Sequence, residues 1–248
     1  MRLRALLLAC GLLFAASAYS ADIYDQAVAH AGRSEADLKR DPGDKPAEVL
    51  RFSGVKPGDT VADFMAAGGY FSELLSYVVG PTGHVLLLNN AGYDGFSQNK
   101  WKDRIEQHHL ANVEHRTIDT AKMDLKDNSL DAVFIIKAYH DLYWVDDKEG
   151  WHKIDVASVL DQLNKAVKHG GVVVVEDHST KPGAGNSVAG SLHRIDEEFA
   201  KKDFEAHGFQ FVKSSDIFRL GSDTRDQISW KGPALGKTDR WLYLFKKP

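Results

Sequence analysis

Three histidines stand where an enzyme built on a β-sheet could transfer protons. His140 follows the apolar run 130–138, His178 follows the apolar run 172–176, and His193 lies just beyond a loop rich in Gly, Pro and Ser. An unperturbed imidazole has a pKa near 6.5, so it can accept a proton at neutral pH. We therefore expect His140 and His178 to be the catalytic residues, with His140 as proton acceptor or substrate contact. A structural role, in which His140 hydrogen-bonds its own loop, is the alternative.

Two aspartates beside these histidines leave metal chemistry open as a second interpretation. Asp141 directly follows His140, and Asp177 directly precedes His178. Two imidazoles and a carboxylate form a suitable ligand set for a divalent ion. His140, His178 and His193 are nevertheless far apart in sequence and share no ligand-spacing motif, so the sequence predicts no metal site.

A turn of small residues separates the first expected strand from the helix after it. Residues 61–64 form a short, mostly apolar run, and apolar residues between 70 and 78 recur at helical spacing. The connection 66–69 reads Ala-Ala-Gly-Gly, so a ligand could approach the backbone closely where a helix N-terminus exposes unpaired N–H groups. With the strand that ends at residue 88, this βαβ unit suits a nucleoside-type cofactor.

Strands and helices alternate along the rest of the chain, which predicts a doubly wound, mostly parallel α/β sheet. Seven strands are expected, namely 61–64, the strand ending at residue 88, 113–118, 130–138, 172–176, 209–212 and 241–245. After the helix 70–78, further helices are expected around 101–109, 156–167 and 196–207, with Gly170-Gly171 ending the helix 156–167. Two short helices, 23–31 and 46–52, predict an N-terminal helical cap over 21–58, ahead of an α/β domain over 59–248.

Aromatic and basic residues near the expected strand ends allow two interpretations each. The aromatic residues that follow the strand 130–138 could form a wall over a flat substrate or pack against the neighbouring helix; they are Tyr139, Tyr143, Trp144 and Trp151. Arg194 and Arg240 each lie close to an aspartate, and we expect internal ion pairs there rather than anion binding.

The first 20 residues have the three-part layout of a secretory signal peptide. Arg2 and Arg4 precede an apolar run, 5–16, and small residues follow it. The run is shorter than the roughly 20 residues of a membrane span. We therefore expect cleavage, a periplasmic or secreted protein, and no stable membrane association after cleavage.

The composition of the expected mature chain, about 228 residues, argues against some kinds of site and partner. The sole cysteine, Cys10, lies in the expected signal peptide, so the mature chain could form neither a disulfide nor a thiolate metal site. Losing two arginines lowers the formal net charge from −4 to −6, and no basic run is present. Nucleic acid is therefore not an expected partner, and the oligomeric state is not predicted.

Several motifs together resemble one enzyme superfamily. The turn Asp63-Phe64-Met65-Ala66-Ala67-Gly68-Gly69 and the stretch 163–178, L-N-K-A-V-K-H-G-G-V-V-V-V-E-D-H, are similar to those of class I S-adenosylmethionine-dependent methyltransferases. Three further blocks, 46–54, 190–196 and 236–240, resemble an exported bacterial group of predicted methyltransferases whose reaction is unassigned. The resemblance covers nearly the whole mature chain, from about residue 38 to 247.

The resemblance implies a Rossmann-like methyltransferase fold, S-adenosylmethionine as cofactor, and a set of cofactor-binding residues. These are Asp63, Ala67, Gly68 and Gly69 at the turn, Asn89 at the ribose position after the second strand, and Asp119 at the adenine position after the third. In the family's D-x-G-x-G-x-G turn, Met65 and Ala67 stand at the first two glycine positions, and Gly69 keeps the third.

The sequence thus predicts an exported S-adenosylmethionine-dependent methyltransferase that acts on a small molecule. Two alternatives remain open. One is a non-catalytic binding protein that keeps the fold but captures another ligand, and the other is a metal-assisted enzyme that uses His140, His178 and His193.

Overall fold

The computed structural model describes residues 22–149 and 151–248, so the predicted signal peptide, residues 1–20, lies outside the described residues. Within those two ranges, no helix has both the length and the apolar character that crossing a membrane requires.

In the described chain, seven strands form a single sheet in the order β3-β2-β1-β4-β5-β7-β6. The strands are β1 (Thr60–Phe64), β2 (His84–Asn89), β3 (Val113–Thr117), β4 (Leu130–Ile136), β5 (Val167–His178), β6 (Gln210–Ser215) and β7 (Arg240–Lys246). Only β7 runs against its neighbours, since β5 and β6 both pair with it antiparallel. The prediction of a doubly wound, mostly parallel seven-stranded sheet is confirmed.

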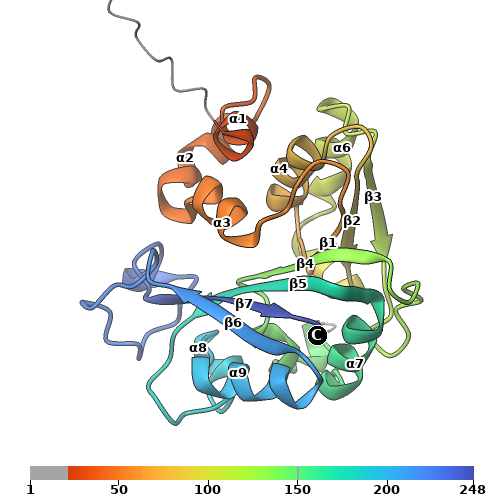
Figure 1. Ribbon diagram of the computed structural model, residues 1–248. Coiled ribbons are helices and arrows are strands. Elements are labelled where there is room, and N and C mark those ends of the chain that lie inside the picture. Colours follow the sequence, from red (N-terminus) through yellow and green to blue (C-terminus); the bar gives the residue numbers. More distant parts are fainter. Residues whose placement is uncertain (1–21, 150) are drawn as a thin grey trace, which may run out of the picture.

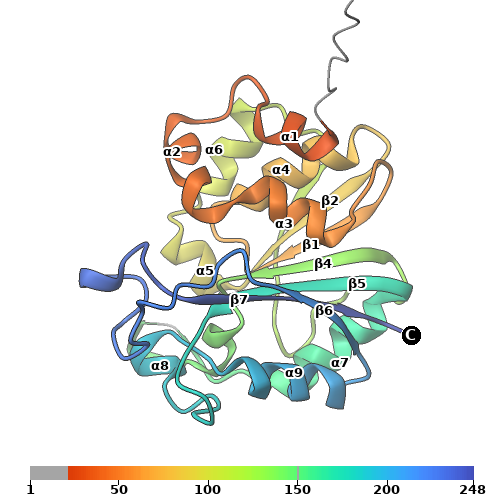
Figure 2. The ribbon, with the colours of Figure 1, turned by 60° about the vertical axis from the view of Figure 1, so that its left-hand side comes forward.

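Helices cover both faces of this sheet (Figures 1 and 2). On one face lie α1 (Ile23–Val28), α2 (Glu35–Asp44), α3 (Pro46–Ser53), α4 (Tyr70–Val79) and α6 (Lys100–Gln107). On the other lie α7 (Val156–Ala166), α8 (Ala189–Leu192) and α9 (Glu197–Ala206). The remaining elements, α5 (Ala91–Phe96), η1 (His140–Tyr143), η2 (Asp147–Glu149) and η3 (Gly232–Ala234), lie in the connections.

Alternation along the strands explains this three-layer arrangement. Successive strand residues point to opposite faces, so Val61 joins the core beneath α4 whereas Ala62 joins the core beneath α7. On the helix side, α7 buries Val159, Leu160 and Leu163, which recur at the three- and four-residue spacing of one helical face. Both faces of the central strands are therefore buried, as a parallel sheet requires.

Within the segment 21–58, the two predicted helices are present as α1 and α3. Ala27 of α1 and Val49 and Leu50 of α3 are buried in the same core as Leu74 of α4. The sequence did not indicate α2, which carries Pro42 and few apolar residues; its N-cap is Ser34, whose hydroxyl accepts the N–H of Asp37.

The glycine pair 170–171 does not end a helix, contrary to the prediction. Helix α7 stops at Ala166, and the strand β5 begins at Val167 and runs through both glycines. Gly170 adopts a left-handed φ of 82°, and the β4–β5 register shifts between Leu130 and Ala132. A β-carbon at Gly171 would lie 2.8 Å from Val167 Cγ1. The pair therefore provides the irregularity that lets β5 keep pairing with β4.

Candidate functional site

A cavity of about 680 Å³ opens at the carboxyl ends of β1 and β4. These strands are neighbours at the point where the strand order reverses, which is where open α/β sheets bind ligands. The turn after β1 contributes residues 65–68, and the end of β4 contributes Ile136 and Lys137. The volume lies in the range of small-molecule sites, roughly 300–1,000 Å³.

The turn after β1 keeps a glycine-like backbone although two of its residues are not glycine. Met65 and Ala67 have φ values of 55° and 50°, and Gly69 has 77°. Non-glycine residues rarely adopt this left-handed region, since the β-carbon crowds the backbone there. The turn thus preserves the backbone conformation that glycine would favour at both substituted positions.

Two side chains outside the turn fix its position. Asn89 at the end of β2 accepts the N–H of Ala67 at 2.9 Å through Oδ1 and donates to the Ala67 carbonyl at 3.0 Å through Nδ2. Arg104 of α6 donates through Nε to the Gly68 carbonyl at 2.7 Å. Its guanidinium also pairs with Asp37 of α2 and with Glu73 of α4, so three helices are tied to the turn.

Asp63 lies at the foot of the turn and faces the helix that follows. Its Oδ2 accepts the hydroxyl of Ser72 in the first turn of α4 at 2.6 Å. Burial raises the pKa of Asp63 to about 6, and the hydrogen bonds from Ser72 oppose that rise only in part.

The predicted cofactor residues divide into those that line the cavity and those that do not. Asp63, Ala67 and Gly68 line it. Gly69 lies behind the turn as the N-cap of α4, where a β-carbon would come within 2.7 Å of Leu87 Cδ1.

Asn89 and Asp119 are not among the cavity's described lining residues. The fully buried amide of Asn89 is occupied by Ala67 and by Asp94, to which Nδ2 donates at 2.9 Å. Asp119 accepts the N–H of Ala121 within its own loop. The structure therefore does not bring these two side chains to the cavity.

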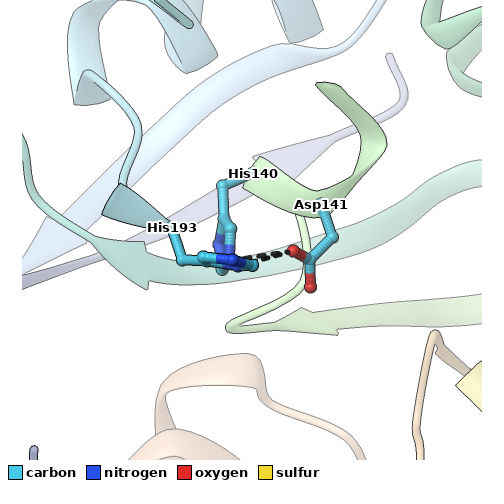
Figure 3. Close-up of side chains that lie close together, drawn as sticks. All are labelled: His140, Asp141 and His193. Carbon is cyan, nitrogen blue, oxygen red and sulfur yellow. Dashed lines mark hydrogen bonds and ion pairs between the residues drawn. The ribbon is translucent and has the colours of Figure 1, made fainter. Parts of the chain in front are cut away.

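The structure brings together histidines that are far apart in the sequence. Figure 3 shows His140 and Asp141 on η1 facing His193 at the end of α8. The carboxylate Oδ1 of Asp141 lies 3.1 Å from His140 Nε2 and 3.2 Å from His193 Nδ1. The other nitrogen of His140, Nδ1, lies 2.7 Å from Oδ1 of the buried Asp177. His140, Asp141 and His193 all line the cavity.

The expectation of an ordinary imidazole pKa at His140 is corrected by this environment. Burial alone would lower the pKa of His140, but the carboxylates of Asp141 and Asp177 raise it to about 10. With both ring nitrogens facing carboxylates, the side chain is protonated at neutral pH. In this arrangement it offers no free lone pair to a substrate proton.

His178 has a different environment although it lines the same cavity. Its Nδ1 lies 2.8 Å from the hydroxyl of Thr238, and its ring centroid is 6.1 Å from that of His140. Burial and the charge of His140 lower its pKa well below the ordinary value. His178 is therefore the neutral histidine of the pair predicted to be catalytic.

Aromatic side chains form one wall of the cavity, though not the four expected. Trp144 and Trp151 line it, with ring centroids 4.6 Å apart. The hydroxyls of Tyr139 and Tyr143 instead both donate to Asp203 of α9, so those two residues belong to the core. Sequence reasoning missed two aromatic residues of this wall, Tyr93 and Trp230, which follow no recognisable motif.

Charged residues from distant elements also line the cavity, and sequence reasoning missed these as well. Asp44 of α2 lies 2.6 Å from Lys137 Nζ, 2.7 Å from Arg40 Nε and 3.4 Å from Arg240 Nη1. All four line the cavity. A lysine directly after the buried run of β4 is the one signal that the sequence carried.

Both arginines expected to form internal ion pairs do so. Arg240 also pairs with the buried Glu176 of β5. Arg194 lies 2.7 Å from Asp223 and donates to the carbonyls of Ser179 and Gln227, which fastens the loop 216–239 to the end of β5.

Solved structures with this architecture are numerous, although no protein-family model and no curated protein matches the chain. An S-adenosylmethionine-dependent methyltransferase from Aquifex aeolicus is 18% identical with a TM-score of 0.62, covering 87% of this chain and 94% of that one. Geranyl diphosphate C-methyltransferase from Streptomyces coelicolor A3(2), solved with Mg²⁺, geranyl diphosphate and S-adenosylhomocysteine, is 14% identical. Its TM-score is 0.60, and the match covers 90% of this chain and 87% of that one.

The chain has the class I methyltransferase fold. Structures of this fold also include the [4+2]-cyclase SpnF, which is 13% identical with a TM-score of 0.61, covering 86% of this chain and 82% of that one. Since one methyltransferase fold carries more than one kind of chemistry, activity has to be argued from the site.

Proposed function

We propose that this protein is an S-adenosylmethionine-dependent methyltransferase acting on a small molecule. The observation that carries the proposal is the turn after β1, whose left-handed residues 65, 67 and 69 keep a glycine-type backbone beside the cavity. In this proposal the cofactor lies against Asp63, Ala67 and Gly68. Gly69 contributes indirectly, by allowing α4 to begin close to Leu87.

The remainder of the cavity supports a small, flat acceptor. Trp144, Trp151 and Trp230 line it together with His140 and His178. Indole faces provide large apolar contacts to a planar molecule, whereas the histidines provide polar contacts. Methyl transfer needs the acceptor to be aligned with the sulfonium methyl group, and such a wall would hold it in place.

Isothermal titration calorimetry with S-adenosylmethionine and S-adenosylhomocysteine tests the proposal. A protein lacking residues 1–20 should bind both ligands with one site per chain. If a folded sample shows no heat with either ligand at millimolar concentration, the cofactor assignment fails. The protein would then be a binding protein for another ligand.

Export is a separate part of the proposal and rests on residues 1–20. Edman sequencing of full-length protein, expressed in a Gram-negative host and recovered from the periplasm, should start shortly after the small residues at 16–20. A mature N-terminus at Met1 would contradict it.

A further inference from the structure

We propose that His140, Asp141 and His193 bind a divalent transition-metal ion. Each offers one ligand atom, and these atoms all lie within 4.8 Å of one another. Ion binding needs no S-adenosylmethionine, and only a role for the ion in methyl transfer rests on the proposed function.

The distances around Asp141 match those between ligands of one ion. Ligands held about 2.1 Å from an ion at 90–109° to each other are separated by roughly 3.0–3.4 Å. Asp141 Oδ1 lies 3.1 Å from His140 Nε2 and 3.2 Å from His193 Nδ1. Charge-assisted hydrogen bonds are shorter, about 2.7–2.9 Å, as the 2.7 Å between His140 Nδ1 and Asp177 shows within the same cluster.

Residues behind the three ligands are arranged as the outer shell of a metal site. Asp177 accepts from His140 Nδ1, so Nε2 becomes the ligand atom when the incoming metal ion displaces its proton. That carboxylate is itself held by the backbone N–H groups of His140 and His178, at 2.8 and 2.7 Å. Tyr93 donates to the second oxygen of Asp141 at 2.6 Å. Metal-bound histidines and carboxylates are usually oriented by partners of this kind.

The fold brings His193 to this position by two local devices. Gly190 lets α8 approach η1, since a β-carbon there would lie 3.1 Å from Trp144 Cδ1. His193 follows α8 in a left-handed conformation with a φ of 50°. A non-glycine residue held in this region indicates that surrounding contacts fix its direction.

The ligand types indicate which ions would bind. Imidazole suits Zn²⁺, Fe²⁺, Co²⁺ and Ni²⁺, whereas Mg²⁺ and Ca²⁺ prefer oxygen ligands alone. Three protein ligands leave coordination positions for water or a substrate oxygen. Because all three ligands line the same cavity as Trp144, Trp151 and Trp230, a substrate in the cavity could reach those positions.

Cobalt binding provides a direct test. Apo protein lacking residues 1–20 should take up one Co²⁺ per chain and develop visible d–d absorption bands, with elemental analysis giving the same stoichiometry. His140→Ala, Asp141→Asn and His193→Ala should each weaken Co²⁺ binding by more than about 100-fold. Asp177→Asn should weaken it by about 10- to 100-fold, as outer-shell changes do.

His178→Ala is the matched control, because His178 lines the same cavity but is not one of the three ligands. It should keep wild-type Co²⁺ affinity. Circular dichroism identifies variants that remain folded, and the rise in melting temperature with Co²⁺ should be as large in His178→Ala as in wild type and smaller in the other variants. Wild-type protein that is folded and takes up no Co²⁺ or Zn²⁺ overturns the proposal, as does loss of the ion in His178→Ala.

The metal proposal and the cofactor proposal can be tested independently of each other. Titration of the metal-free protein with S-adenosylhomocysteine in EDTA tests the cofactor alone, and Co²⁺ titration without cofactor tests the ion alone.

Discussion

Met65 and Ala67 adopt the left-handed backbone of the turn after β1 without being glycine. The sequence placed Met65 and Ala67 at two positions that are glycine in the family's turn. The structure shows that the backbone conformation is retained, because Asn89 and Arg104 hold the carbonyls and N–H groups from outside. Contacts between residues 22 and 36 positions apart cannot be inferred from the local motif.

Ala67→Gly should therefore be tolerated or should stabilise the protein. A left-handed non-glycine residue costs roughly 1–2 kcal/mol, whereas the added freedom of glycine in the unfolded chain costs about 0.4–1 kcal/mol. We expect the free energy of unfolding in urea to stay the same or rise by up to about 1.5 kcal/mol. Ala157→Gly on the exposed side of α7 is the control, with an expected loss of up to about 1 kcal/mol. A larger loss for Ala67→Gly than for the control would refute strain at this position.

Asp63 should make stability depend on pH in a definite direction. Its pKa is about 6 in the folded protein, above the ordinary 3.8, so the folded state binds the proton more tightly. This contribution is fully present below about pH 4 and is lost as pH rises through 6; the two-unit shift corresponds to about 3 kcal/mol.

Asp63→Asn removes that titration. The variant should gain stability relative to wild type between pH 4 and pH 7, by up to about 3 kcal/mol, in paired urea titrations. A difference between the two proteins that stays constant over this range would show that Asp63 does not titrate there.

At the scale of elements, the sequence predicted well the strands and helices that apolar runs define. It predicted poorly those features that depend on contacts with other elements. The central strands could be recognised because a parallel sheet buries both of their faces. The start of β5 at Val167 could not, since pairing with β4 and β7 overrides the glycine pair as a helix stop. The helix α2 was missed because ion pairs and caps hold it: Arg40 and Asp44 face the cavity, and Asp37 pairs with Arg104.

We expect the ion pairs of Asp44 to hold α2 against the sheet. Burial alone would raise its pKa, but Lys137 and Arg40 lower it to about 2. The folded pKa lies below the ordinary 3.8, so its contribution is present above pH 4 and is lost as pH falls toward 2. Asp44→Asn should lower the free energy of unfolding at pH 7 by about 2–3 kcal/mol.

The control for this variant lies on the same helix. Glu35 pairs with Lys39 at 3.8 Å while both side chains are largely exposed, so Glu35→Gln should change stability by less than about 1 kcal/mol. Chemical denaturation of both variants from pH 7 down to pH 3 measures the effect. Equal losses at pH 7 would show that Asp44 does not fasten the helix.

At the scale of the whole molecule, the topology brings together residues that no motif connects. His193 meets Asp141 across 52 positions of sequence, and Trp230 joins the same cavity from the loop before β7. The sequence identified His140, His178 and the turn, because each lies at or just after the end of a strand. It could not place Asn89 away from the cavity or bring Tyr93 into it, since both depend on how the segment after β2 folds back.

The central claim is that S-adenosylmethionine lies against the turn after β1, and Gly68→Val tests it most directly. Gly68 lines the cavity, its φ is not left-handed, and a β-carbon there would lie 3.7 Å from Lys100 Cβ. Valine should thus fill ligand space without disturbing the fold. Gly95→Val on α5 is the matched control, since a β-carbon at that exposed glycine meets nothing within 4 Å.

The measurement is the Kd for S-adenosylhomocysteine, by calorimetry, of wild type and both variants. We predict that Gly68→Val weakens binding at least about tenfold, or 1.4 kcal/mol, whereas Gly95→Val stays within about twofold of wild type. Wild-type affinity in a folded Gly68→Val protein would contradict the account.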